Sequence, residues 1–470
     1  MRKISYCILF SLLIFRSAFA SDSLTAFPLA DYYRIILAYH PVAAQAKNFS
    51  AMARSEIRTA RGAFDPVLKA AYEEKKLNEK NYWNLWQSKL QVPVWFGADL
   101  KLAYDNSSGA FLDEEWRTPS GGLTYIGVTV PLGQGLLIDE RRATLRQAQQ
   151  LSRIAEAERV KVVNKLLLEA AKSYWEWYFT YNRLSFHEEA LRLAQQRFEA
   201  IRERVIFGDL PAIDSLEAFI EVQNRINIRS QSLLEFSNAR LIVSNFLWSD
   251  QQAPVELNAS MIPMADEAFA DTLSAVQRDV LLETARLNHP ELEKINAKLT
   301  QLDIERRWAA EKLRPKLNLD YNFLRSGDQP WQESAGSWSL NNNYKMGLTF
   351  SVPLFLREER GKFNLVKLKS TQTEFEKQQL SRDINTSVLT AWNELTLLQE
   401  QILVQEAQVL NSARMLEGEQ FRFSNGESSI FLINTRENAL INSRIKLAEL
   451  KAKFAKSKAY LYWSAGVLLQ

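Results

Sequence analysis

Two very long stretches of this chain contain neither glycine nor proline, and they limit what the chain can fold into. Between Gly135 and Gly208 lie 72 such residues, and between Gly361 and Gly418 lie 56. Runs of this length without helix-ending residues are typical of long coiled helices rather than of globular units. At about 1.5 Å per residue, a helix over residues 138–205 would be roughly 100 Å long, which requires a rod or a tube.

Within each helical stretch, a set of mostly apolar positions recurs at alternating spacings of three and four residues. Such a set is called a seam. The first seam contains Leu184, His187, Leu191, Ala194, Phe198, Ile201 and Val205, and the second contains Leu440, Ser443, Leu447, Leu450, Phe454, Ser457 and Leu461. Because this spacing places all seven positions on one face of a helix, each seam predicts packing against a neighbouring helix.

Several sequence landmarks occur twice along the chain at a fixed offset of 249 residues. The pairs are His40 and His289, Pro41 and Pro290, Pro66 and Pro315, and Tyr72 and Tyr321. A constant offset across several landmarks indicates an internal duplication in which each copy is one structural unit.

Strand patterns occur where the helical patterns stop. After Pro315, apolar residues alternate with polar ones over residues 317–323, and the same alternation occupies residues 344–352. A period of two is typical of a strand with one apolar and one polar face. The first repeat carries matching runs at residues 68–72 and 126–130, so each repeat is predicted to contain a helix, strands and further helices.

One further stretch of the first repeat leaves two possibilities open. Every second residue from Leu90 to Tyr104 is apolar or aromatic. This pattern fits either one long strand or two strands that turn between Pro93 and Gly97.

The first twenty residues have the pattern of a secretory signal peptide. Two basic residues precede an apolar run, and Ala18-Phe19-Ala20 forms a small-residue cleavage site. We therefore expect residues 1–20 to be removed on export. The one cysteine, Cys7, lies in this segment, so no disulfide is expected in the exported chain.

The charge balance of the chain argues against nucleic acid as a partner. The chain has 58 Lys and Arg and 55 Asp and Glu residues. Removal of the signal segment takes away three basic residues and no acidic ones, so the exported chain carries no net charge. Binding to a phosphate backbone calls for a basic excess, which is missing here.

A membrane-spanning β-barrel fits the strand patterns. No exported segment has about eighteen consecutive apolar residues, so a spanning helix is not expected. Aromatic residues such as Trp83, Trp86, Trp331 and Trp338 lie near the strands. Two to four strands per repeat are too few for a roomy barrel from one chain, so several chains are expected to share it. The alternative is a small water-soluble sheet that caps a coiled-coil rod.

The repeats predict the organisation of the chain. The first repeat covers residues 21–250, with a helix at 29–65, barrel strands at 66–132, and a helical hairpin at 133–248 whose tip lies near residue 208. A linker at 251–275 leads to the second repeat at 276–470. This repeat has a helix at 276–314, barrel strands at 315–354, and a helical hairpin at 355–466 whose tip lies near residue 426.

An ordered set of motifs accompanies these repeats. The set consists of the duplicated His-Pro start, the helix endings Phe64-Asp65-Pro66 and Leu313-Arg314-Pro315, the strand endings Val130-Pro131-Leu132 and Val352-Pro353-Leu354, the pairs Glu140-Arg141 and Glu359-Arg360, and tips centred on Gly208 and Gly426. Together these motifs resemble the TolC-like outer-membrane efflux protein family over nearly the whole exported chain.

The resemblance implies a mainly α fold with a β-barrel part, built from the duplicated helix-strands-helices repeat. In this family three chains form a homotrimer that shares a β-barrel in the outer membrane. A long coiled-coil helical barrel then continues through the periplasm.

The resemblance also implies a function. The trimer would be the passive exit duct of a tripartite efflux pump or a type I secretion system, carrying drugs, small molecules or proteins. Its partners would be a periplasmic adaptor (membrane fusion) protein, an inner-membrane transporter and outer-membrane lipid. The alternative is a soluble periplasmic coiled-coil adaptor or spacer protein.

The two hairpin tips are the candidate gate, because small shifts in coiling can loosen or tighten them. The family often carries acidic residues after the second tip glycine, where they form charged rings. Here those positions hold Leu432 and Thr435, whereas Asp214 and Glu217 occupy the equivalent positions of the first hairpin. These two acids fit either a charged ring or a solvated helix start. The gate candidates are Gly208, Asp214, Glu217, Gly426, Leu432 and Thr435.

The sequence contains no pattern for catalysis, a cofactor or a metal. His40 and His289 precede prolines at helix starts, which favours a capping or turn role, and His187 lies in a helical seam. Residues 175–178 are rich in aromatic side chains, but consecutive residues point around a helix and cannot converge on one ligand. No phosphate-binding loop, nucleophile elbow or His-Glu-x-x-His pair occurs, so we expect no enzyme activity.

Overall fold

The computed structural model describes residues 25–258, 260–264, 275–327 and 342–468. The chain divides into two compact units, each assembled from three separate parts of the sequence. Unit 1 contains Met1–His40, Glu169–Thr272 and Leu397–Lys456, and unit 2 contains Pro41–Leu168, Leu273–Thr396 and Ser457–Gln470. The expected signal segment lies outside the described residues.

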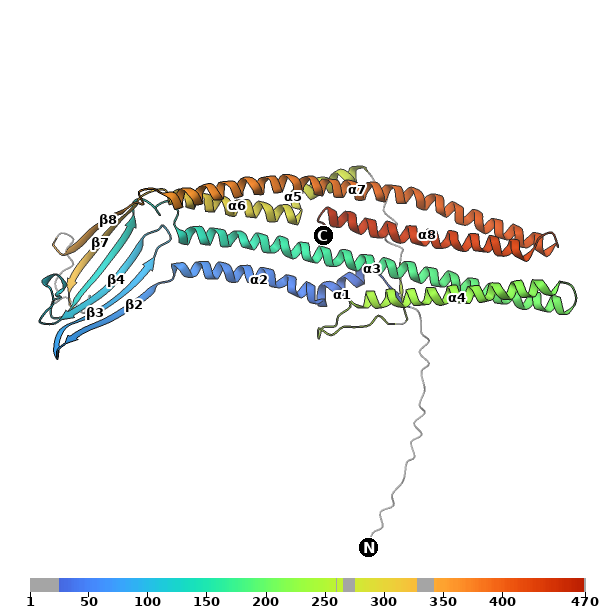
Figure 1. Ribbon diagram of the computed structural model, residues 1–470, viewed down its shortest axis with the longest axis horizontal. Helices are drawn as coiled ribbons and strands as arrows, with labels where there is room; N and C mark the ends of the chain where they lie inside the picture. Colours follow the sequence, from blue (N-terminus) through green and yellow to red (C-terminus); the bar gives the residue numbers. More distant parts are fainter. Residues whose placement is uncertain (1–24, 259, 265–274, 328–341, 469–470) are drawn as a thin grey trace, which may run out of the picture. The chain divides into compact units, whose positions relative to one another are not determined.

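Most of the described chain is helical (Figure 1). The helices are α1 (Leu29–Tyr39), α2 (Pro41–Arg61), α3 (Glu140–Ile206), α4 (Ala212–Ser244), α5 (Ala275–Asn288), α6 (Pro290–Glu311), α7 (Arg357–Ser424) and α8 (Ile430–Ser464). Helix α3 has 67 residues and fills most of the first stretch without glycine or proline. Helix α7 has 68 residues and runs through both Gly361 and Gly418.

The segment expected as one helix at residues 29–65 is divided at His40. Helix α1 ends at Tyr39, and His40 is extended with ψ 133° before α2 begins at Pro41. A residue before proline avoids the helical region, and proline itself has no N–H to donate to the preceding turn. The second repeat divides in the same way, because His289 has ψ 127° between α5 and α6.

Most positions of the helical seams expected from the sequence are buried. In unit 1, Leu184, Ala194 and Ile201 of α3 are each less than 9% exposed. The seam on α8 is buried at Leu440 and also at Ser443, where a small side chain lets a neighbouring helix come close. The Nε2 group of Gln405 on α7 donates to the backbone oxygen of Ser443 at 3.0 Å.

Unit 2 contains a six-stranded antiparallel sheet. Its strands are β2 (Val67–Leu77), β3 (Lys80–Pro93), β4 (Asp99–Ser108), β5 (Leu123–Pro131), β7 (Lys316–Ser326) and β8 (Tyr344–Ser351), in the order β2-β3-β4-β5-β7-β8. The first repeat thus contributes four strands and the second contributes two (Figure 1). Among the described residues, strands β2 and β8 each have a neighbour on one side only.

Strands β3 and β4 settle the question that the sequence left open at residues 90–104. They are two strands, joined by a turn in which the Val94 N–H donates to the Ala98 carbonyl at 2.8 Å. Gly97 has φ +98°, a conformation that costs glycine little and other residues more.

The register of the strands separates an apolar face from a polar one. Tyr321 on β7 lies opposite Val128 on β5 and Met346 on β8, so apolar side chains form a row across three strands. On the other face, Lys101 Nζ and Asp320 Oδ1 form an ion pair at 2.6 Å. The alternation read from the sequence therefore produces a two-faced sheet.

A second, short sheet belongs to unit 1. Strand β1 (Thr25–Phe27) pairs in parallel with β6 (Met261–Pro263). The buried hydroxyl of Tyr174 on α3 donates to the carbonyls of Phe27 at 2.7 Å and Met264 at 3.0 Å, and it accepts from the Met264 N–H at 2.9 Å. One side chain thus fixes the first strand and the end of β6 to the long helix.

No helix within these ranges is both long and apolar enough to cross a membrane. Trp331 and Trp338, which lie near the predicted strands in the sequence, are outside the described residues, as are residues 265–274 of the linker.

Candidate functional site

The two hairpin tips in unit 1 have the same backbone geometry. Gly208, between α3 and α4, has φ +82°, and Gly426, between α7 and α8, has φ +80°. At the first tip the Asp209 N–H donates to the Arg204 carbonyl, and at the second the Glu427 N–H donates to the Arg422 carbonyl, both at 2.9 Å. This is the bonding that ends a helix at a left-handed residue.

Backbone conformation is the reason that glycine occupies both tips. A Cβ atom built on Gly208 or Gly426 would meet no heavy atom within 4 Å. The tips therefore need glycine for its positive φ and not for space.

The four other gate candidates lie just beyond these turns. Asp214 and Glu217 are half-buried at the start of α4, with Asp214 in its first turn. On α8, Leu432 is half-buried and Thr435 is exposed, and the Thr435 hydroxyl donates to the Phe431 carbonyl at 2.8 Å. The structure does not bring these four side chains together, and their role in a gate stays a prediction.

Two buried acids near the second tip were not singled out from the sequence. Glu437 on α8 is 3% exposed and forms an ion pair with Arg197 on α3, whose guanidinium also donates to Asn434. This network joins the two hairpins across 240 residues of sequence. No local pattern could have predicted it, because its two halves belong to different repeats.

The second buried acid, Glu419, holds the second tip loop. It is 6% exposed and accepts from the Ser428 hydroxyl, and Arg422 and Arg436 lie 3.8 Å and 3.7 Å from its oxygens. The hydrogen bond from Ser428 and the two guanidinium groups hold the pKa of the Glu419 carboxyl below its usual range.

Apolar packing also joins the hairpins near their tips. Ile201 of α3, Ala218 of α4 and Ile430 of α8 form a buried cluster. The half-buried side chains around it are Phe198, Val205, Leu210 and Phe423. Since the cluster contains residues of both hairpins, a change in one tip would be felt by the other.

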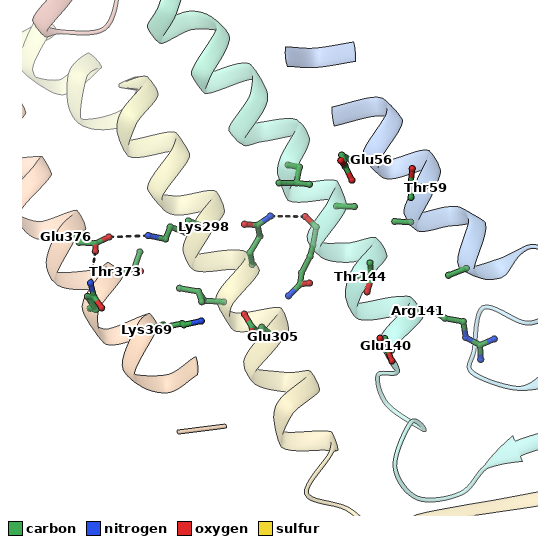
Figure 2. A pocket seen from close by; sticks show the side chains of 18 residues that line it. Glu56, Thr59, Glu140, Arg141, Thr144, Lys298, Glu305, Lys369, Thr373 and Glu376 are labelled. Atoms are coloured by element: carbon green, nitrogen blue, oxygen red, sulfur yellow. Dashed lines mark hydrogen bonds and ion pairs between the residues drawn. The ribbon is translucent and has the colours of Figure 1, made fainter. Parts of the chain in front are cut away.

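Unit 2 contains a cavity of about 920 Å³ between α2, α3, α6 and α7 (Figure 2). Lys298 Nζ on α6 lies 3.3 Å from Glu376 Oε2 on α7, and Gln301 Nε2 on α6 donates to the Gln147 carbonyl on α3 at 3.1 Å. These two contacts link three of the four helices that surround the cavity. The cavity has no local sequence pattern, because its lining comes from both repeats.

Two of the three histidines have contacts that suit a structural role. His289 is the N-cap of α6, where its Nδ1 accepts from the Glu291 N–H at 3.2 Å. The His40 ring stacks on Phe246, with ring centroids 6.0 Å apart. His187 is 9% exposed, and burial followed by Arg225 lowers its pKa. Among the described residues, no group of His, Cys, Asp and Glu has the arrangement of a metal site.

The fold of the chain is similar to that of several solved outer-membrane channels. The open-state MtrE channel of Neisseria gonorrhoeae is similar, with a TM-score of 0.67 at 15% identity over 94% of this chain and 89% of that chain. The CmeC channel of Campylobacter jejuni gives 0.63 at 14% identity over 94% and 86%. VceC of Vibrio cholerae gives 0.63 at 14% over 94% and 97%.

A second comparison concerns the second repeat. Residues 281–467 match the family described as outer membrane efflux protein. No curated protein matches the chain by sequence. The duplicated, mainly helical fold that the sequence predicted is confirmed by the similarity to the solved channels, which at these identities concerns the fold.

Proposed function

We propose that three copies of this chain form a passive exit duct through the outer membrane. The observation that carries the proposal is the sheet of unit 2. Its apolar face is exposed, and no described residue pairs with the outer edge of β2 or of β8. A free edge cannot face lipid, so it has to pair with another chain.

The two free edges are compatible with one another. Neighbouring strands are antiparallel throughout the sheet, and with six strands β2 and β8 run in opposite directions. Pairing β8 of one copy with β2 of the next therefore continues the antiparallel order. Three such sheets supply eighteen strands, and barrels of about 16–18 strands leave an aqueous channel.

Exposed apolar residues on the helices support contacts between copies. Helix α4 exposes Phe219, Ile226 and Leu233 at a spacing of seven residues, which places them on one face. Helix α7 exposes Leu403 and Leu410 at the same spacing. In a closed symmetric ring of copies, neighbouring copies cover the same apolar patches in every copy.

The tips of the two hairpins serve as the gate in this proposal. The paired glycine turns and the apolar cluster around Ile201 support it, because a coiled hairpin can shift between discrete packings. Asp214 and Glu217 would form an acidic ring at this point. Block of the pore by a hexammine cobalt cation tests the ring, since Asp214→Asn with Glu217→Gln should weaken the block. Unchanged block would contradict the acidic ring but would not contradict the duct.

The duct would work with a periplasmic adaptor (membrane fusion) protein and an inner-membrane transporter, in a tripartite efflux pump or a type I secretion system. The cargo would be drugs, small molecules or proteins. Export would depend on the signal peptide at residues 1–20, whose basic, apolar and small-residue regions support cleavage.

Cell fractionation tests the proposed function. The protein should sediment with the outer membrane and run as a trimer that dissociates on heating. Release together with the soluble periplasmic proteins would contradict the duct and support a coiled-coil spacer.

A further inference from the structure

We propose that the cavity between α2, α3, α6 and α7 is a binding subsite for organic cations with an apolar body. The inference rests on the proposed function, because it treats this part of the helical wall as a stopping place for cargo inside the duct. To the proposed duct it adds one class of cargo and the place where that cargo binds.

The size and floor of the cavity suit such a molecule. Its volume of about 920 Å³ lies within the range of roughly 300–1,000 Å³ that is usual for small-molecule sites. The floor consists of small and aliphatic side chains, namely Ala60, Ala63, Ala148, Leu151 and Leu302. An apolar ring system can pack on such a surface and leave water.

The side chains that line the cavity include more carboxylates than cationic groups. Two of the three lining cations are already engaged, Lys298 with Glu376 and Arg141 with Asp99 at 2.8 Å. The third is Lys369.

Three lining glutamates have no cationic partner. None of the described cations forms an ion pair with Glu56, Glu140 or Glu305, and Glu305 is half-buried. Figure 2 shows these carboxylates on three different helices around the cavity. A cationic group on a bound molecule would therefore be attracted from several sides.

A threonine in the wall offers a polar contact to a ligand. Thr373 on α7 is 2% exposed and lines the cavity (Figure 2). Its hydroxyl makes no hydrogen bond with any described residue. A polar atom of a bound molecule could therefore bond this hydroxyl in place of water.

The cavity lies on the side of unit 2 that leads to the polar face of the sheet. Arg141 lines the cavity and reaches Asp99, the first residue of β4. Asp99 is two residues from Lys101, so both lie on the same face, and Lys101 pairs there with Asp320. In the proposed duct this polar face lines the water-filled lumen, where cargo passes.

Dye binding to the purified full-length protein in detergent tests the subsite. The probe is rhodamine 6G, a cation with a large aromatic body, and binding is measured by fluorescence anisotropy. Glu305→Gln removes one charge with little change of shape and should weaken binding roughly fivefold, since a solvated ion pair at close range is worth about that factor. Thr373→Val removes the hydroxyl and should also weaken it.

Two controls make the test specific. Glu374→Gln changes an exposed carboxylate on α7 that does not line the cavity, and its affinity for the dye should match the wild type. Nile red, which is neutral, reports adsorption to detergent and apolar surface, and its signal should be the same in every variant. Heat-dissociable trimers must be present in each sample.

Three results would overturn the inference. These are an absence of saturable rhodamine binding, an equal loss in Glu374→Gln and Glu305→Gln, and unchanged affinity in both Glu305→Gln and Thr373→Val. A protein that conducts ions in lipid bilayers but binds no dye would contradict only this inference. A protein that forms no channel at all would contradict the proposed duct.

Discussion

At the scale of single residues, Tyr174 connects three segments of unit 1. It is fully buried on α3, and its hydroxyl bonds backbone groups of Phe27 and Met264. Burial raises the pKa of Tyr174 to about 12, so the hydroxyl keeps its proton throughout the neutral range.

Replacing Tyr174 with phenylalanine should destabilise the protein. The change leaves two carbonyls and one N–H without their partner, which typically costs about 1–3 kcal/mol in the free energy of unfolding. Urea unfolding followed by circular dichroism measures the change. Tyr181→Phe is the matched control, because no described residue bonds the Tyr181 hydroxyl, and equal losses in the two variants would contradict this role.

His289 should make stability depend on pH. Burial lowers its pKa below the ordinary value of about 6.5, so the unfolded chain binds the proton more readily than the folded one. The stability from neutral His289 is therefore complete above the unfolded pKa and is lost as pH falls through the folded pKa. Protonation of Nδ1 would also remove the cap on the Glu291 N–H.

The variant His289→Asn separates the titration of His289 from its role as an N-cap, since asparagine keeps an N-cap acceptor but does not titrate. Thermal midpoints at pH 7.5 and pH 5.5 should differ less in this variant than in the wild type. Part of the difference should remain, because burial also lowers the pKa values of His40 and His187. An identical difference in variant and wild type would show that His289 does not contribute.

At the scale of elements, two glycines near the second hairpin tip should respond in opposite ways to alanine. Gly426 has φ +80°, so Gly426→Ala should cost about 1 kcal/mol. Gly418 lies inside α7 with open space at its Cβ position, so Gly418→Ala should stabilise by roughly 0.5–1 kcal/mol. Free energies of unfolding measure both changes. A loss of stability in Gly418→Ala would contradict the placement of Gly418 inside α7 with open space at its Cβ position.

The sequence predicted most elements because their patterns are local. Seams of three and four residues gave the long helices, and alternation gave strands such as β7 and β8. The helix expected at residues 29–65 is two helices, since the effect of Pro41 on His40 overrides the continuous pattern.

Contacts between the repeats could not be predicted in this way. The pairing of Arg197 with Glu437 and the lining of the cavity around Thr373 depend on which helices become neighbours. Alternation also could not tell one strand from two at residues 90–104, because the turn at Gly97 preserves the parity of the apolar positions.

At the scale of the whole molecule, the two faces of the sheet should differ in their tolerance of charge. Leu348 on β8 is 64% exposed on the apolar face, and its neighbour Thr349 belongs to the polar face. If the apolar face meets lipid, Leu348→Lys should cost about 2–4 kcal/mol and reduce the amount of trimer in the outer membrane. Thr349→Lys should leave it unchanged, and equal amounts of trimer in both variants would contradict the orientation.

The proposed duct depends on the joining of three sheets along β8 and β2, and a particle image of the detergent-purified protein tests this most directly. The image should show threefold symmetry and a closed ring of eighteen strands. A particle that is monomeric and stays in solution without detergent would contradict the proposed duct.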